Sequence, residues 1–403
     1  MPYRPERRTI PVAEARAILA VHGEPVDRVE SAAVDDAIGR VLAEDVYASV
    51  DVPPFARAAM DGFAVRAADT AGASRGHPIR LRVIESIYTG AAPSRPVEPG
   101  TCAAIATGAP LPDGADAVVM VEATARSGDE AEIFEPASPR QHVGRAGGDL
   151  VAGEIAVAAG TVLVPARLAV LSALGLTSVR VFAKPRVAIL STGDEIVAPG
   201  GRLGPGQIYD ANTTALAAAV RLHGGEPVPA PRTRDDRAAL TAAFEDCLRE
   251  DLVLFCGGSS VGDRDYSLDI LAALGSVHFE GLQLKPGKPT IFATARGVPV
   301  FGLPGNPVSC LTNMYLFVAP MLHRMARLPP PIERTVTARL SETIGSPAGR
   351  HQIYPVRLEG GGAVPVFKSS GEITSLARAD GFIEIPADVE RLEAGTAVTV
   401  RLF

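Results

Sequence analysis

The sequence predicts a multidomain protein of the α/β plus β class. The chain has 403 residues, and a single compact core rarely grows beyond about 250 to 300 residues. Strand-like and helical patterns alternate between residues 184 and 327, which is typical of an α/β domain. Short β-prone runs separated by Gly and Pro turns lie before and after that segment, so we expect β domains on both sides.

Residues 1–50 and 146–183 are expected to form one discontinuous N-terminal linker domain of helical and β character. Residues 11–22 place apolar side chains on one helical face, which predicts a short amphipathic helix. Pro165 suits the first turn of a second helix, and Gly175 suits its end. We therefore expect two short helices in this domain.

Residues 51–145 are expected to form a small β domain. The β-prone runs at residues 81–84, 102–106 and 117–122 are separated by Gly, Pro and Asp turns.

The α/β domain is predicted for residues 184–327. Its expected strands are residues 187–190, 252–256, 290–293 and 298–301, and its expected helices are residues 212–223, 235–249 and 267–274. Such alternation predicts a parallel sheet. A last apolar helix begins at Pro307, and Pro320 is expected to kink it or end it early.

Residues 328–403 follow a Pro-rich linker and contain only strand-like runs of useful length. These runs are residues 336–340, 352–358, 364–367, 382–385 and 397–402. Gly and Pro turns separate them, as in a small barrel or sandwich. We take a C-terminal β-barrel domain as the prediction.

Composition excludes several classes of partner. The net charge of -7 disfavours binding to nucleic acid or to anionic membranes, which need a basic surface. No stretch approaches the roughly 20 apolar residues of a membrane span, and residues 1–9 precede no signal-like apolar run, so we expect a cytoplasmic protein. The cysteines have no zinc-type spacing and are expected to be reduced thiols: Cys102, Cys247, Cys256 and Cys310.

Polar, glycine-rich loops follow three strands of the α/β domain, at residues 191–195, 257–263 and 303–307. Ligands bind beyond the carboxyl ends of strands in open α/β sheets, so we expect these loops to converge on one site. Gly257 and Gly258 leave amide groups free to approach a phosphate closely. A tight turn with no ligand is the alternative, and a P-loop is excluded because no Walker lysine follows.

Two further segments suit anions. Residues 305–309 open a helix, where unpaired amides favour an anion, although a simple helix cap is the commoner explanation of such a segment. Lys285 and Lys288 lie on a turn stiffened by prolines, which suits a small dianion such as molybdate. The alternative is a solubilising surface turn.

Carboxylates on this domain offer ligands for a hard cation. Mg²⁺ commonly uses one or two carboxylates together with substrate phosphates, and Asp194, Glu195, Asp235 and Asp265 all fall in loops. Helix capping competes with this interpretation, most clearly for Asp235, which with Asp236 precedes a helical pattern.

Six collinear motifs resemble the molybdopterin molybdenumtransferase family, known as MoeA in bacteria and as the E domain of gephyrin in animals. They are residues 59–66, 106–110, 191–195, 257–263, 285–289 and 303–309, and the resemblance covers essentially the whole chain. It implies an elongated homodimer, with a MogA-like α/β domain whose site is shared between subunits. Asp61 is then expected to face the other subunit's Asp265.

The resemblance also implies the site residues. Those at the catalytic centre are Asp61, Glu195, Asp235 and Asp265, of which Glu195 and Asp265 bind Mg²⁺. Those expected to bind substrate are Thr107, Asp149, Gly257, Gly258, Ser259, Ser260, Lys285, Lys288, Pro304, Asn306, Pro307 and Ser309.

The implied reaction takes adenylylated molybdopterin and molybdate and yields molybdenum cofactor and AMP, with Mg²⁺ neutralising phosphate charge. We expect positioning rather than a covalent enzyme intermediate to supply the acceleration. A MogA-like adenylyltransferase and apo-molybdoenzymes are the implied partners. Whether tungstate replaces molybdate stays open.

One departure from the family and two alternatives bear on this prediction. Bacterial members often carry a lysine just upstream of the lysine turn, where this chain has Gly281 within residues 280–283. A non-catalytic paralogue or scaffold that binds molybdopterin or molybdenum cofactor is one alternative. Nucleotide chemistry like that of CinA or MogA is the other, and the full set of domains disfavours it.

Overall fold

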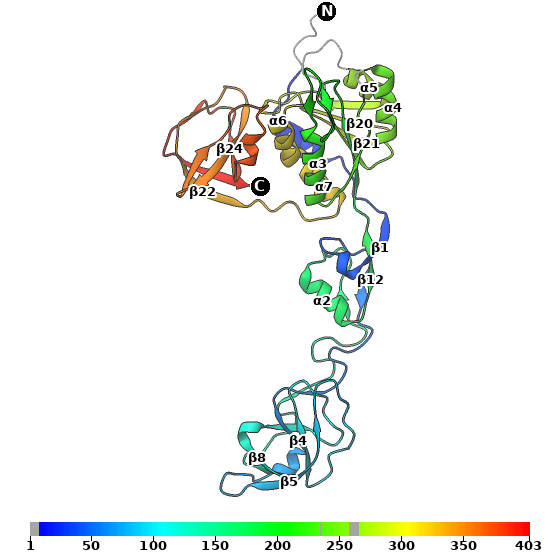
Figure 1. Ribbon diagram of the computed structural model, residues 1–403, viewed down its shortest axis with the longest axis vertical. Helices are drawn as coiled ribbons and strands as arrows, with labels where there is room; N and C mark the ends of the chain where they lie inside the picture. The colour runs from blue at the N-terminus through cyan, green and yellow to red at the C-terminus, as the bar shows by residue number, and fades with distance from the viewer. Residues whose placement is uncertain (1–7, 234–235, 258–265) are drawn as a thin grey trace, which may run out of the picture. The chain divides into compact units, whose positions relative to one another are not determined.

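The computed structural model describes residues 8–233, 236–257 and 266–403 and divides the chain into two compact units (Figure 1). The first unit contains the described residues up to Glu30, then Gly39–Val41 and Arg180–Phe403. The second contains Ser31–Ile38 and Leu42–Val179. The four domain boundaries expected from the sequence stay predictions. Within the described ranges, no helix has the length and apolar character needed to cross a membrane.

The second unit is built on a six-stranded sheet with strand order β7-β4-β6-β5-β9-β8. Its strands are β4 (Gly62–Val65), β5 (Ile79–Ile87), β6 (Thr101–Ile105), β7 (Ala117–Met120), β8 (Thr124–Ser127) and β9 (Glu130–Ile133). The runs expected at residues 81–84, 102–106 and 117–122 fall in β5, β6 and β7. Alternate residues of the sheet fill two separate apolar cores, so both of its faces are covered.

Shorter elements complete the second unit. They are η1 (Val34–Asp36), β2 (Val46–Tyr47), β3 (Arg57–Ala58), η2 (Ala67–Thr70), η3 (Val121–Ala123), β10 (Val143–Gly144), β11 (Ile155–Val157) and α2 (Pro165–Ala173). Helix α2 begins at Pro165, as expected, because the first helical position needs no N–H donor. Strands β1 (Val29–Ala33) and β12 (Ser178–Phe182) carry the chain across the boundary between the units.

A six-stranded sheet of order β16-β13-β17-β21-β20-β18 forms the centre of the first unit. Its strands are β13 (Arg186–Ser191), β16 (Glu226–Pro229), β17 (Leu252–Cys256), β18 (Gly275–Phe279), β20 (Ile291–Ala295) and β21 (Val298–Leu303). The prediction of a parallel sheet is correct for β16, β13, β17 and β21 and wrong for β20, which runs antiparallel to both of its neighbours, β21 and β18. Arg296 and Gly297, both at positive φ, join β20 to β21, and a two-residue link can connect only antiparallel strands.

Helices cover both faces of this sheet (Figure 1). They are α1 (Val12–Ala20), α3 (Ala211–Leu222), α4 (Arg237–Cys247), α5 (Tyr266–Leu274), α6 (Pro307–Asn313) and α7 (Ala319–Met325). Val187 and Ile189 of β13 face a core shared with α1, α3, α6 and α7, whereas Ala188 and Leu190 face α4 and α5. This alternation gives a layered α/β/α domain with β13 fully buried.

The last helix of the domain does not end at Pro320. A single π-helical segment, η4 (Met314–Val318), joins α6 to α7, and Pro320 lies in the first turn of α7. Because proline has no N–H, the local widening of the helix absorbs the missing hydrogen bond. The expected early end is therefore wrong, and the helix continues to Met325.

The C-terminal lobe is a closed barrel, as predicted. Its strands are β22 (Thr335–Leu340), β24 (His351–Glu359), β25 (Gly362–Pro365), β26 (Gly381–Ile385) and β28 (Ala397–Leu402), with β23 (Ile344–Gly345), α8 (Thr374–Ala377) and β27 (Arg391–Leu392) in the connections. The order β24-β25-β22-β28-β26 closes because β26 also pairs with β24. Strand β19 (Leu284–Lys285) adds to β24 in parallel, with Lys285 opposite Gln352.

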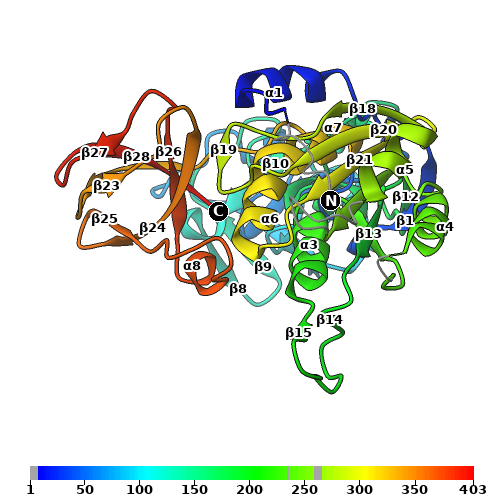
Figure 2. The same ribbon diagram turned by 90° about the horizontal axis from the view of Figure 1, so that it is seen from above.

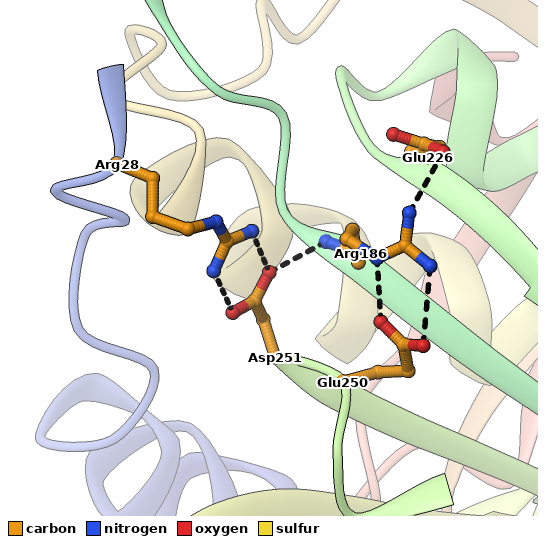
Figure 3. Close-up of polar contacts among 5 residues, drawn as sticks. All are labelled: Arg28, Arg186, Glu226, Glu250 and Asp251. Carbon is orange, nitrogen blue, oxygen red and sulfur yellow. Dashed lines mark hydrogen bonds and ion pairs between the residues drawn. The ribbon is translucent and has the colours of Figure 1, made fainter. Parts of the chain in front are cut away.

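A polar network lies at the amino ends of β13, β16 and β17 (Figure 3). Asp251 accepts two hydrogen bonds from Arg28 and one from the backbone N–H of Arg186. The Arg186 guanidinium in turn donates to Glu250 and Glu226. The network fixes the N-terminal segment to the amino ends of these strands, which lie opposite their carboxyl ends.

Candidate functional site

A cleft of about 430 Å³ lies at the carboxyl ends of β13, β17 and β21 in the first unit. It is lined by Ser191, Thr192, Glu195, Ile196, Ile208, Tyr209, Asp210, Ala211, Asn212, Cys256, Gly257, Pro289, Pro304, Gly305, Asn306, Pro307 and Gly371. The carboxyl ends of the three strands and the described residues that follow them thus converge, as the parallel order of these strands requires. Predicted site residues from all three loops are among the lining residues.

Gly257 is required by close packing in the cleft. Its φ is +137°, and a Cβ atom there would overlap both the hydroxyl and the carbonyl oxygen of Thr192. The tight turn expected as one explanation of this glycine is therefore correct; it does not depend on whether the Gly257 amide also binds a phosphate. The neighbouring predicted residues Gly258, Ser259 and Ser260 lie outside the described residues.

The loop before α6 forms another wall. Pro304 is buried, and Asn306 is exposed at the N-cap position, where its side chain donates to Ser370 Oγ at 2.9 Å instead of capping the helix. Asn212 of α3 donates to the carbonyl oxygen of Gly305 at 2.8 Å. These bonds hold the loop from two sides.

The lysine turn borders the cleft through Pro289. Its ends are closed by a bond from the Leu282 N–H to the Lys288 carbonyl at 2.8 Å, and Thr290 donates to the Gly287 carbonyl at 2.7 Å. Lys285 and Lys288 are both only half-buried. The turn is closed by hydrogen bonds and carries two half-buried lysines; that they bind an anion stays a prediction.

Gly281, where family members often carry lysine, is buried beneath the N-terminal segment. Its carbonyl accepts from the Ile10 N–H at 3.1 Å, and a Cβ atom would lie 3.1 Å from Thr9 Cγ2 and 3.4 Å from the Arg8 carbonyl. A longer side chain would displace residues 8–10, which explains this departure physically.

The predicted carboxylates are distributed over both units. Glu195 is exposed on the cleft, next to Gly193. Asp235 and Asp265 lie outside the described residues. The N-cap of α4 is Asp236, which accepts from the Ala239 N–H at 2.9 Å, so the capping function considered for Asp235 belongs to its neighbour.

Asp61 and Thr107 lie together in the second unit. Asp61 Oδ1 accepts from the Thr107 N–H at 2.7 Å and from its hydroxyl at 3.0 Å. These two bonds, the backbone one first, lower the pKa of the exposed Asp61 carboxyl and keep it ionised. Asp149 is exposed on a different loop, where its N–H donates to the Val52 carbonyl at 3.0 Å.

Several lining residues were not predicted. Ile208 and Tyr209 form β15, which pairs with β14 (Ile196–Val197) on a loop that extends away from the sheet (Figure 2). Asp210 caps α3 by accepting from the Thr213 N–H at 3.0 Å. An Asp two residues before the predicted start of the helix at residue 212 was a usable signal. Gly371 comes from the C-terminal lobe, and no sequence pattern pointed to it.

Cys256 is a cleft residue whose thiol is unreactive. Its Sγ lies 3.7 Å from Cys310 Sγ, and the hydrogen bond to Cys310 together with burial raises the pKa of Cys256 well above its ordinary value. All four cysteines are free and buried in the structure. A thiol held protonated is a poor nucleophile.

Three family descriptions match the chain end to end. The MoeA N-terminal region (domain I and II) matches residues 10–175. The probable molybdopterin binding domain matches residues 188–324, which include the cleft loops, and the MoeA C-terminal region (domain IV) matches residues 337–403.

Curated relatives and solved structures agree with these matches. Molybdopterin molybdenumtransferase 2 of Mycobacterium tuberculosis is 38% identical over 90% of this chain and 92% of its own length. The molybdopterin molybdenumtransferase of Bacillus subtilis is 35% identical over 99% of this chain and 95% of its own. A molybdopterin biosynthesis MoeA protein from Pyrococcus horikoshii has a TM-score of 0.85 at 42% identity, covering 98% of this chain and 99% of its own.

The fold and the cleft therefore define a multidomain enzyme of molybdenum cofactor biosynthesis, a transferase with a molybdopterin-binding α/β domain. The resemblance seen in the sequence motifs is confirmed, and so is the fold class. The chain belongs to the MoeA family of molybdopterin molybdenumtransferases.

Proposed function

We propose that this protein inserts molybdate into adenylylated molybdopterin, forming molybdenum cofactor and releasing AMP in an Mg²⁺-dependent reaction. The observation that carries the proposal is the cleft itself. It brings Glu195, Gly257 and the loop at residues 304–307 together, next to the turn that carries Lys285 and Lys288. A carboxylate, close backbone and two cations suit a substrate with a phosphoanhydride and a separate oxyanion.

Mg²⁺ is proposed to bind Glu195 and Asp265. The donor chemistry fits, because Glu195 presents an exposed carboxylate to the cleft and Mg²⁺ prefers oxygen ligands from one or two carboxylates and phosphates. Among the described residues no group of three or more His, Cys, Asp or Glu could hold a metal, so substrate oxygens would complete the set. When bound, the ion neutralises phosphate charge.

The chain's own residues are proposed to act by positioning. The cationic turn holds molybdate, and Gly257 and the loop at residues 304–307 orient the nucleotide. A covalent enzyme intermediate is not expected, since the thiol at the cleft, Cys256, has a raised pKa.

A homodimer with a shared site is also proposed. The partner subunit's Asp61 and the partner's Thr107 would complete the cleft, since this pair presents an exposed carboxylate kept ionised by two hydrogen bonds. A substrate-adenylylating enzyme would act before this step, and apo-molybdoenzymes would take up the product. Light scattering of the purified protein tests the dimer directly.

The testing experiment is AMP release from adenylylated molybdopterin, with and without molybdate and Mg²⁺, together with reconstitution of an apo-molybdoenzyme. Release that depends on both ions, with reconstitution, supports the proposal. Tight substrate binding without release would favour a non-catalytic paralogue or scaffold. Glu195→Gln should abolish release, whereas Asp194→Asn, at an exposed neighbour that does not line the cleft, should retain it.

A further inference from the structure

Asn313 is a buried amide at the end of α6. Its exposed fraction is 0%, and its Nδ2 donates to the carbonyl oxygen of Ser309, one turn earlier, at 2.7 Å. A carbonyl oxygen only accepts, so the amide must present its NH₂ group there. Its Oδ1 therefore faces away from Ser309, and it has no hydrogen-bond partner among the described residues.

An unpaired acceptor in this position is not explained by packing. Buried polar atoms nearly always have a partner, and one without a partner destabilises the fold. Leucine has the same branched arrangement of side-chain heavy atoms and carries no acceptor that burial would leave unpaired. The amide at position 313 therefore calls for a reason beyond stability.

The amide lies against the apex of the lysine turn. Gly287 has a φ of +122°, and a Cβ atom on it would overlap Asn313 Nδ2 and lie 3.1 Å from Asn313 Cγ. On another side, the buried Thr290 hydroxyl donates to the Gly287 carbonyl at 2.7 Å. Gly287 is thus held between Asn313 and Thr290, and it is flanked in sequence by Pro286 and Lys288.

We propose that Asn313 is a positioning residue for Lys285 and Lys288. By contacting Gly287 through its NH₂ group, Asn313 fixes the apex of the turn, on which the directions of both lysines depend. Asn313 itself does not touch the oxyanion. The inference rests on the proposed function, in which this turn binds molybdate.

The test is Asn313→Leu, with molybdate as the probe. We expect the half-saturating molybdate concentration in the AMP-release assay to rise about tenfold, as for the loss of one well-placed polar contact, while kcat stays within about twofold. The thermal midpoint without molybdate should be unchanged or higher, and the increase that molybdate causes should shrink. A purely structural residue would change the midpoint alone.

Two comparison variants separate the possible failures. Lys285→Gln should raise the half-saturating molybdate concentration, and Thr312→Val, at the adjacent buried position of α6, should leave it unchanged. Wild-type molybdate dependence in Asn313→Leu, with a clear effect of Lys285→Gln, overturns the inference alone. If neither variant changes the molybdate dependence, the oxyanion function of the turn is overturned, and the inference with it. If Asn313→Leu does not fold, Asn313→Ser takes its place with the same measurements and outcomes.

Discussion

Arg28 binds Asp251 through two parallel hydrogen bonds of 2.7 Å, one from each terminal guanidinium nitrogen (Figure 3). Burial alone would raise the pKa of Asp251, but the bonds from Arg28 and from the Arg186 N–H outweigh it and hold the pKa below its ordinary value. A bidentate, charge-assisted pair of this kind ties residue 28 to the start of β17 more firmly than an ion pair with a single contact would.

Asp251→Asn should therefore lower the free energy of unfolding by about 1 to 3 kcal/mol at pH 7, as measured by urea titration. Because the folded pKa is depressed, the contribution is complete above about pH 4, the unfolded value, and is lost as pH falls through the folded pKa. Asp246→Asn, at an exposed ion pair with Arg249, should change stability by less than about 0.5 kcal/mol. Equal effects of the two variants would contradict this account.

Gly257→Ala should disrupt the cleft. The methyl group would overlap Thr192, and the φ of +137° is unfavourable for alanine, so we expect a loss of about 2 kcal/mol or more in the free energy of unfolding. Gly305→Ala is the matched control, since a Cβ atom there meets nothing within 4 Å, and it should stay within about 0.5 kcal/mol of the wild type. A tolerated Gly257→Ala would show that the contact with Thr192 is not rigid.

Asp61 should titrate below its ordinary pKa because of Thr107. Thr107→Val removes the hydroxyl donor and keeps the N–H, which makes the larger contribution, so the pKa should rise only part of the way to its ordinary value. Carboxyl carbon NMR of aspartate-labelled protein measures this. A complete return to the ordinary value would assign the effect to the hydroxyl instead.

His223 should make the protein less stable in mild acid. His323 must donate from Nδ1 to the Pro329 carbonyl, at 2.7 Å, so its Nε2 accepts from His223 Nδ1, at 3.1 Å. Burial, and then His323, lower the pKa of His223 to about 4. The unfolded histidine takes up a proton below about pH 6.5 and the folded one does not until about pH 4, so stability falls between these values, by up to about 3 kcal/mol.

The variant His223→Gln checks this. Without the titrating ring, the decline in the free energy of unfolding between pH 6.5 and pH 4 should become shallower, as followed by urea titrations at a series of pH values. An unchanged decline would mean that other groups cause it.

Strong local patterns in the sequence predicted most of the fold. Strand β17 and strand β28 have the predicted bounds, and α2 begins at the predicted Pro165, because apolar runs and punctuating residues act locally there. Strand β18, at one edge of the sheet, was missed, since residues 275–279 carry few apolar side chains and pair with β20, which begins only at Ile291, after β19. Local residue patterns could not reveal such pairings.

The site was predicted in part for the same reason. Glu195, Gly257 and Asn306 follow strands directly, so the parallel order brings them together. Tyr209 and Gly371 reach the cleft from a projecting loop and from the barrel lobe, and only tertiary structure places them there. The family resemblance supplied the residues of the second unit, Asp61 and Thr107, whose pairing no spacing rule would give.

Strand β19 makes the C-terminal barrel part of the framework of the lysine turn. Lys285 lies opposite Gln352 of β24, and the His351 N–H donates to the Gln283 carbonyl at 2.9 Å, so the turn starts from a strand that another lobe completes. A chain cut at the Pro-rich linker after residue 327 would leave this strand without its neighbour. The lobes are consequently not interchangeable modules: recombining the α/β domain with a foreign C-terminal region would have to preserve one parallel strand pair for the lysines to keep their place.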